Sequence, residues 1–276
     1  MKRACVIGWP VEHSRSPLLH GYWLKKYGID GVYTKEAVAP EAVADFLRSL
    51  RANGFVGCNV TVPHKAAAFA VADEREASAE AVSAANTLWL SDGKLVAANT
   101  DTYGYMTNLG LQAPGWDRRD APVSVLGAGG AARAIIYGFL NAGVNEIRVF
   151  NRTRARAETL AQQFGPRVKA FDWSEREVGS RNAAVLVNTT TIGMNSVGTL
   201  DIDLAGFDPE CVISDIVYVP LETELLQKAK SEGLRTVDGL GMLLHQGVPG
   251  FEKWFGVCPE VTNELRDIIV ADIEGH

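Results

Sequence analysis

A short apolar strand, a glycine-rich turn and a helix follow one another between residues 123 and 140, and this unit constrains the fold more than any other stretch. Val123–Leu126 is the apolar run and Ala131–Leu140 has the pattern of a helix. Gly127 permits a tight turn, and Gly129 lets the backbone approach a pyrophosphate on the helix N-terminus. Because the glycines follow a strand and open a helix, they predict a dinucleotide site. The residues expected to bind the pyrophosphate are Gly127, Ala128, Gly129, Gly130 and Ala131.

The residues after the next predicted strand indicate which dinucleotide binds. A site for NAD places an Asp or Glu there to hold the ribose 2′-hydroxyl. This chain instead has Asn151, Arg152, Thr153 and, four residues after the first arginine, Arg156. Guanidinium groups bind a 2′-phosphate through charge-assisted hydrogen bonds, whereas an acid would repel it. We therefore expect NADP(H) rather than NAD(H), bound by these four residues.

Charge and cysteine content exclude several classes of protein. The formal net charge of −6 and the pI near 5.5 argue against partners such as nucleic acid or an anionic membrane. The four cysteines form no CxxC or Cys/His cluster, so we expect no metal site and a reducing, cytoplasmic location. The apolar stretches 4–11 and 121–144 are interrupted by glycine, proline or arginine. We therefore expect neither a signal peptide nor a membrane span.

Strand and helix signals alternate along the whole chain, which predicts parallel sheets with helices on both faces and hence an α/β fold. Ser16, followed by Pro17, is expected to cap the first helix, and Thr223 to cap a later one. Asp92-Gly93 indicates a hairpin. The expected strands are 4–7, 32–37, 55–60, 87–90, 95–98, 123–126, 146–150, 184–187 and 212–217. Two helices are expected to begin after Ser16 and after Pro63. The other expected helices are 41–52, 131–140, 154–164, 224–231, 241–255 and 261–273.

Polar clusters in the first hundred residues follow the expected strands, at the ends where open α/β sheets bind ligands. Their hydroxyls and amides suit a small polyhydroxylated molecule, and one lysine and one aspartate are available for proton transfer. Each residue also has a structural interpretation: Ser16 as a helix cap, Asn99 as a turn residue and Lys65 as a solvated helix residue. The clusters are Ser14 with Ser16, Asn59–Lys65, Asn86-Thr87 and Asn99–Asp101.

Nine motifs together resemble those of the shikimate dehydrogenase family, in its NADP-dependent biosynthetic form. In chain order they are HSRSP, NVTVPHK, ANTL, NTDTYG, GAGGAAR, NRTRAR, NTT-x-x-GM, DIVYVPLETELL and GLGML-x-x-Q. The resemblance covers residues 5 to about 255. It implies a substrate domain joined to a Rossmann domain, with the reaction in the cleft between them. It also implies the reversible reduction of 3-dehydroshikimate to shikimate by NADPH.

The resemblance further implies roles for individual residues. Lys65 matches the catalytic lysine of the family and Asp101 its aspartate partner. The remaining matches fall into two groups. The substrate group is Ser14, Ser16, Thr61, Asn86, Tyr218 and Gln246, and the cofactor group adds Ile216, Gly239 and Met242, on the nicotinamide side, to the pyrophosphate and 2′-phosphate residues named above.

Three departures from the family pattern concern loop geometry and rate. Thr191 stands where the family usually has proline, which should loosen the loop before Gly193. Ser83–Ala85 replaces a common Gly-Ala-Val, and Ala77 stands where many members have an acid. Other readings remain: a quinate/shikimate dehydrogenase, a paralogue acting on an amino analogue of shikimate, or an inactive NADP-sensing regulatory module. Retention of Lys65 and Asp101 argues against the inactive module.

A chain of 276 residues is compatible with one large or two medium domains, and the motif order favours two. The expected domains are 1–101 for substrate binding and catalysis, a doubly wound Rossmann domain at 102–237 for NADP, and helices at 238–276 that return to the first domain. The return is expected because Gln246 must reach the substrate. The sequence leaves open whether the protein is a monomer or a homodimer.

Overall fold

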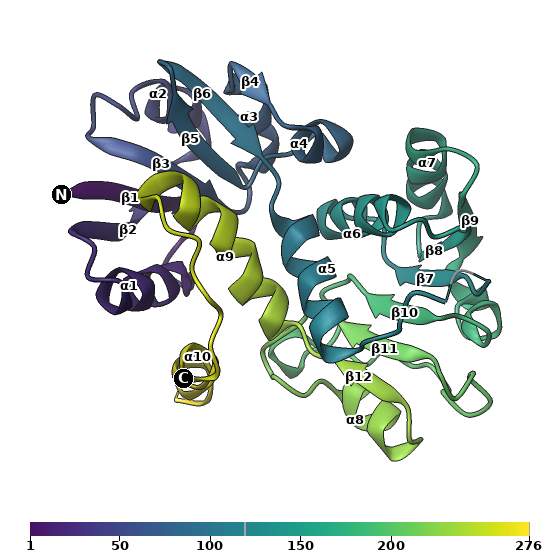
Figure 1. Cartoon of the computed structure of the whole chain (residues 1–276). Helices are drawn as coiled ribbons and strands as arrows, with labels where there is room; N and C mark the ends of the chain where they lie inside the picture. Colours follow the sequence, from purple (N-terminus) through teal and green to yellow (C-terminus); the bar gives the residue numbers. More distant parts are fainter. Residues whose placement is uncertain (119, 276) are drawn as a thin grey trace. The chain divides into compact units, whose positions relative to one another are not determined.

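The computed structural model describes residues 1–118 and 120–275, which form two compact units (Figure 1). Unit 1 comprises Met1–Asp101 together with the segment from Leu244 onward, and unit 2 comprises Thr102–Leu243. The boundary at which the chain returns from unit 2 to unit 1, between Leu243 and Leu244, lies within the helix Leu240–Phe255. Unit 2 thus ends six residues after 237, the expected end of the Rossmann domain.

The sheet of unit 1 has six strands in the order β2-β1-β3-β5-β6-β4. All neighbours are parallel except that β5 runs antiparallel to β3 and β6. The hairpin between β5 and β6 has Asp92 and Gly93 at positive φ, as the dipeptide predicts. The sheet is therefore mixed. The strands are β1 (Lys2–Gly8), β2 (Gly31–Ala37), β3 (Phe55–Val60), β4 (Glu74–Arg75), β5 (Thr87–Ser91) and β6 (Lys94–Ala98).

The helices of unit 1 come from both ends of the chain. Trp254 of α9 donates its indole N–H to Leu88 O at 2.9 Å, and it packs so closely over Gly57 that a side chain there would collide with it. The expected helix at 41–52 is shorter, because a 3₁₀ turn at Pro40–Ala42 leads into α2 and residues 49–54 form turns. The helices are α1 (Ser16–Lys26), α2 (Val43–Arg48), α3 (Lys65–Val71), α4 (Ala77–Val82), the later part of α9 (Leu240–Phe255) and α10 (Asn263–Glu274).

Unit 2 is an all-parallel sheet in the order β12-β11-β10-β7-β8-β9. This is the doubly wound order of dinucleotide-binding domains, which reverses between β7 and β10. The strands are β7 (Val123–Leu126), β8 (Ile147–Asn151), β9 (Val168–Asp172), β10 (Val185–Asn188), β11 (Val212–Asp215) and β12 (Arg235–Val237), and the helices are α5 (Asp101–Gln112), α6 (Gly130–Asn141), α7 (Arg154–Phe164), α8 (Glu224–Ser231) and the start of α9.

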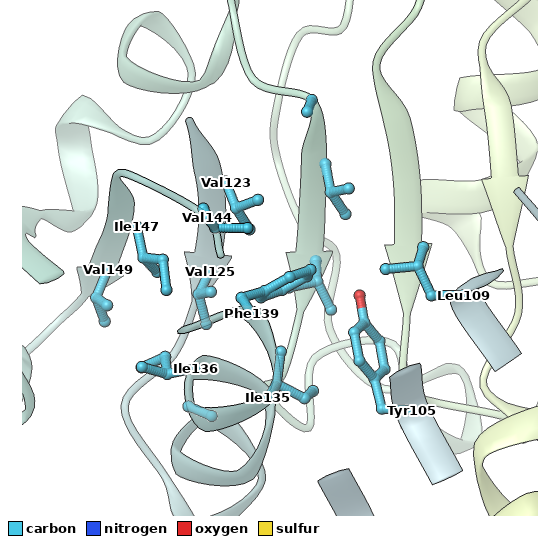
Figure 2. Packing of buried hydrophobic residues seen from close by; sticks show 14 of the residues in the cluster. Tyr105, Leu109, Val123, Val125, Ile135, Ile136, Phe139, Val144, Ile147 and Val149 are labelled. Carbon is cyan, nitrogen blue, oxygen red and sulfur yellow. The ribbon is translucent and has the colours of Figure 1, made fainter. Parts of the chain in front are cut away.

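The core of unit 2 lies between this sheet and the helices that cover it (Figure 2). Phe139 of α6 and Tyr105 of α5 contact each other edge to face, with ring centroids 5.7 Å apart. Around them pack the β-branched residues of β7 and β8, including Val125 and Val149. Such strands, apolar on both faces, are typical of parallel sheets buried on both sides.

Candidate active site

Lys65 and Asp101 form an ion pair at one edge of the unit 1 sheet, where Lys65 Nζ lies 2.6 Å from Asp101 Oδ2. Lys65 begins α3, shortly after β3, and Asp101 begins α5, shortly after β6. The strands β1, β3 and β6 run in one direction, so their carboxyl ends share this edge, and the antiparallel β5 begins there. The topology thus joins two residues that are 36 positions apart.

Asn86 holds the other oxygen of the Asp101 carboxylate. Thr100 N donates to Asn86 Oδ1 at 2.8 Å, and because a backbone N–H can only donate, this contact identifies the amide oxygen. The amide nitrogen therefore faces Asp101, and Asn86 Nδ2 donates to Asp101 Oδ1 at 2.8 Å. The carboxylate is thus held from both sides, while the lysine side chain is 33% exposed and accessible to a small molecule.

Ser14, Ser16 and Thr61 lie at the same edge, in the loops that follow β1 and β3. Ser14 Oγ donates to Ser16 Oγ at 3.2 Å and accepts from Ser16 N at 3.3 Å. The expectation that Ser16 caps α1 is wrong: Arg15 is the N-cap residue and Ser16 is the first helical residue. The Ser14 hydroxyl accepts the backbone N–H of Ser16, and the Ser16 hydroxyl accepts no backbone N–H of the helix. Thr61 is half-buried, and its N–H donates to Ile7 O near the end of β1.

The glycine turn of unit 2 has the open backbone that a dinucleotide requires. Gly127 has φ +104°, and a Cβ there would lie 2.9 Å from Thr189 Oγ1, so only glycine fits. Gly129 caps α6 without a side-chain hydrogen bond, and both Gly129 and Gly130 are exposed. Ala128 and Ala131 are half-buried beside them. The N–H groups at the start of α6 are therefore available to an anion.

The basic segment after β8 contains one arginine that forms ion pairs and two that form none with the described residues. Arg154 is paired with Glu158 and Asp172, at 3.0 Å and 2.8 Å. Arg152 and Arg156 are exposed and make no ion pair with any residue that the structure describes. The residue at the strand end is Asn151, whose amide donates to Thr153 O, so the position that carries an acid in NAD sites is uncharged here. These residues fit NADP(H).

Three further predicted cofactor residues come together in unit 2. Ile216 and Met242 are half-buried and pack against the same core. Gly239 approaches Ile216 so closely that a Cβ would lie 2.4 Å from its carbonyl oxygen. Of the two remaining substrate residues, Tyr218 lies in unit 2 and Gln246 lies in unit 1 on α9, and both are half-buried.

A buried carboxylate that sequence reasoning missed joins two loops of unit 2. Asp215, at the end of β11, accepts from Asn188 Nδ2 and Val217 N at 3.0 Å each and from Thr223 Oγ1 at 2.8 Å. Thr223 is the N-cap residue of α8, as expected, but its hydroxyl binds Asp215 rather than the helix. Burial raises the pKa of Asp215 to about 6, although these three donors oppose the shift. The available signal was a polar residue ending an otherwise apolar strand.

Asn188 fixes the loop in which Thr191 replaces the usual proline. Its Oδ1 accepts from Thr190 N at 3.0 Å and from Thr190 Oγ1 at 2.7 Å, and its Nδ2 donates to Ile192 O at 3.2 Å. Thr191 itself is exposed. The loop is therefore held by residues on either side of Thr191.

In residues 1–118 and 120–275, no three His, Cys, Asp or Glu side chains gather as metal ligands would. Over the same residues, no helix combines the length and the apolar character needed to cross a bilayer.

The fold defines a class of protein, in which a Rossmann-type dinucleotide-binding domain is joined to a second α/β domain, as the predicted fold class requires. A protein of Azorhizobium caulinodans named "Shikimate dehydrogenase (NADP(+))" is 53% identical over 273 residues, which cover 99% of this chain and 97% of that protein. The chain belongs to the shikimate dehydrogenase family.

Family models and solved structures agree with this assignment. The model "Shikimate dehydrogenase substrate binding domain" matches residues 6–88, and the model "Shikimate / quinate 5-dehydrogenase" matches residues 112–204. Shikimate 5-dehydrogenase from Thermus thermophilus, solved with NADP(H) and shikimate, has a TM-score of 0.87 at 35% identity and covers 98% of this chain and 100% of its own. Quinate dehydrogenase from Corynebacterium glutamicum, solved with NAD, has a TM-score of 0.89 at 27% identity, covering 98% and 99%.

Proposed function

We propose that this protein is an NADP-dependent oxidoreductase that interconverts 3-dehydroshikimate and shikimate in the cytoplasm, a step of chorismate and aromatic amino-acid biosynthesis. The observation that carries the proposal is the Lys65–Asp101 ion pair, which Asn86 holds at the carboxyl ends of the unit 1 strands. The chain that contains this pair is 53% identical to a protein named as a shikimate dehydrogenase. Unit 1 binds the substrate and unit 2 binds NADP(H). The four cysteines are free thiols, which suits a reducing compartment.

Lys65 acts on the oxygen of the reacting carbon. When bound, NADPH would supply the hydride that reduces the carbonyl carbon of 3-dehydroshikimate. Negative charge then develops on the oxygen, and the Lys65 ammonium stabilises it by donating a hydrogen bond. The ion pair with Asp101, at 2.6 Å, holds that ammonium in place before the substrate arrives. Two alternatives account for the proton: Lys65 transfers it to the oxygen, or Lys65 only polarises the bond while water or Asp101 relays a proton to the oxygen.

The remaining polar residues orient the ring. The hydroxyls of Ser14 and Ser16, 3.2 Å apart, bind the substrate carboxylate as a pair of donors. The ring hydroxyls contact Thr61 and Asn86 from unit 1, with Asp101 as acceptor. Gln246, on the part of α9 that belongs to unit 1, completes the substrate contacts of that unit.

The cofactor is held by exposed backbone N–H groups and by two arginines that form no ion pair within the described residues. The N–H groups at the start of α6 receive the pyrophosphate at the glycine turn. Arg152 and Arg156 receive the 2′-phosphate together with Asn151 and Thr153. The contact group formed by Ile216, Gly239 and Met242 faces the nicotinamide side.

A steady-state assay with shikimate and quinate, each with NADP⁺ and NAD⁺, tests this proposal. We expect the highest kcat/KM with shikimate and NADP⁺. A higher kcat/KM with quinate would show that quinate, not shikimate, is the preferred substrate. A higher kcat/KM with NAD⁺ would contradict the proposed binding of a 2′-phosphate by Arg152 and Arg156. Absence of turnover in all four combinations, with cofactor still bound, would indicate a regulatory NADP-binding protein and overturn the proposal.

A further inference from the structure

Tyr33, on β2, begins a buried chain of hydrogen bonds that ends at the Lys65–Asp101 pair. Its hydroxyl donates to Asn59 Oδ1 at 2.6 Å. Burial raises the pKa of Tyr33 well above its usual value, so the hydroxyl keeps its proton and acts as a donor. Asn59 Nδ2 then faces Asn86 O, which can only accept, so the orientation of the Asn59 amide is fixed at both ends.

Thr87 carries the chain onward to Asn86. Asn59 Nδ2 donates to Thr87 Oγ1 at 3.1 Å, and Thr87 Oγ1 donates to Asn86 Oδ1 at 3.0 Å. Asn86 Nδ2 in turn donates to Asp101 Oδ1. Tyr33, Asn59, Asn86 and Thr87 are all less than 8% exposed, so water does not compete for these bonds.

The tyrosine ring is fixed by aromatic neighbours. His20 stacks on it with centroids 4.1 Å apart and an interplanar angle of 18°, and Trp254 lies 5.9 Å away. Burial lowers the pKa of His20 to about 3, so this neighbour is neutral. The Ser16 side chain lies beside the Tyr33 hydroxyl and opposes the rise of its pKa. Tyr33 therefore stands between the paired serines and the chain that supports Asp101.

We propose that Tyr33 is a positioning residue that couples the two serines, where the substrate carboxylate binds, to the Lys65–Asp101 pair, where the reaction takes place. This inference rests on the proposed function. Through Asn59 and Thr87, the Tyr33 hydroxyl reinforces the hold of Thr100 on the Asn86 amide and hence the orientation of the Asp101 carboxylate. Tyr33 acts through these residues, and it exchanges no proton with the substrate.

Tyr33→Phe removes the first donor and leaves Asn59 Oδ1 without that partner. We expect kcat/KM for shikimate to fall about tenfold, less than the roughly 10²-fold that a 1 Å misplacement of reacting groups can cost. The KM for NADP⁺ should not change, because the pyrophosphate and 2′-phosphate residues lie in unit 2. Tyr105→Phe is the matched control, since it removes a buried tyrosine hydroxyl from the core of unit 2 and should leave kcat/KM unchanged.

Two further measurements separate positioning from folding. Thr87→Val breaks the chain at a second place and should reproduce the tenfold fall, whereas Thr87→Ser retains the hydroxyl and should restore activity. In a double-mutant cycle, Tyr33→Phe should cost less in a Ser16→Ala background than alone, because the coupled end is already lost. The fraction of folded enzyme in each variant is measured by circular dichroism and NADP⁺ binding.

The inference is overturned if Tyr33→Phe and Thr87→Val turn over shikimate as fast as the unmodified protein, or if their losses match a loss of folded protein. Additivity with Ser16→Ala would also overturn it. Absence of activity in the unmodified protein would instead contradict the proposed function, so the two failures are distinguishable.

Discussion

Lys65 in unit 1 and Arg156 in unit 2 are both cations at candidate ligand sites, yet among the described residues only the lysine side chain forms an ion pair. In unit 1, Asp101 holds Lys65, Asn86 holds Asp101, and buried donors hold Asn86. In unit 2, the Arg156 side chain is exposed and forms no ion pair with any residue of the described chain. A group that must act on one atom gains from being fixed beforehand. A group that neutralises a phosphate gains from having no acid to compete for it.

Arg154 shows that this difference is local. It lies two residues from both Arg152 and Arg156, yet its guanidinium group forms ion pairs with Glu158 and Asp172. A basic segment is therefore not uniformly available to a ligand. The following predictions test the contrast between fixed and free groups, from the largest expected effect to the smallest.

Removing the fixed cation should have the largest effect. We expect Lys65→Ala to lower kcat by roughly 10²–10⁴, with a smaller change in KM, because the lysine acts mainly in the transition state. The measurement is steady-state reduction of NADP⁺ by shikimate. Lys94→Ala is the control, since Lys94 pairs with Glu74 away from the site and should keep full activity. Near-normal turnover of Lys65→Ala would remove Lys65 from the mechanism.

The buried carboxylate of unit 2 should make stability depend on pH. The folded pKa of Asp215, about 6, lies above the reference value of 3.8, so the folded state binds the proton more tightly than the unfolded state. Its contribution is therefore present below about pH 4 and is lost as the pH rises through 6, a change of about 3 kcal/mol in the free energy of unfolding.

Asp215→Asn tests this dependence. The amide cannot ionise and still offers an oxygen to Asn188 and Val217. We expect the variant to gain about 3 kcal/mol relative to the unmodified protein between about pH 4 and pH 7.5, by urea unfolding at several pH values. An equal difference between the two proteins at every pH would contradict the raised pKa.

Removing a free cation should affect one cofactor only. A hydrogen bond to a charged group contributes about 1.5–3 kcal/mol, so Arg156→Ala or Arg152→Ala should raise the KM for NADP⁺ about 10- to 100-fold. The KM for NAD⁺ should stay the same because that cofactor has no 2′-phosphate. Arg154→Ala is the matched control and should change neither constant. An equal loss with both cofactors would argue against a 2′-phosphate site.

The loop at Thr191 should show the smallest effect. Thr191→Pro restores the residue usual in the family, and the Thr191 N–H, which proline would remove, donates to no acceptor in the described part of the chain. Proline restricts the unfolded chain, so we expect the free energy of unfolding to rise by about 0.4–1 kcal/mol. Thermal unfolding measures this change, and kcat should stay within about twofold of the unmodified value because Asn188 already holds the loop. A fall in stability would show that the threonine backbone is incompatible with proline.

The sequence predicted the strands that carry strong apolar patterns and the residues that follow them. Phe55–Val60, Val123–Leu126 and the helix Arg154–Phe164 match the structure at both ends. β9 was missed because it is an edge strand in which only Val168 is fully buried, so it lacks an apolar run. The helix α5 was missed because Gly104 and Gly110 lower its helix propensity.

Side-chain partners were harder to predict than elements. Motif order pointed to Lys65 and Asp101, and the structure pairs them, but no local pattern relates Tyr33 to Asn59 or Asp215 to Thr223. These contacts depend on which strands become neighbours, and the sheet order that decides this is a property of the whole unit. Serine at a helix start was likewise ambiguous, because Ser14 supplied the hydrogen bond expected of Ser16.

The contact of Trp254 with Leu88 and Gly57 has a consequence for synthesis of the protein. Trp254 and Leu88, which the indole hydrogen bond joins, are 166 residues apart in the chain. All of unit 2 lies between them in the sequence. A contiguous unit completes its contacts as it leaves the ribosome, whereas unit 1 must wait for the final helices. The half of the protein that is translated first is therefore the half that is completed last.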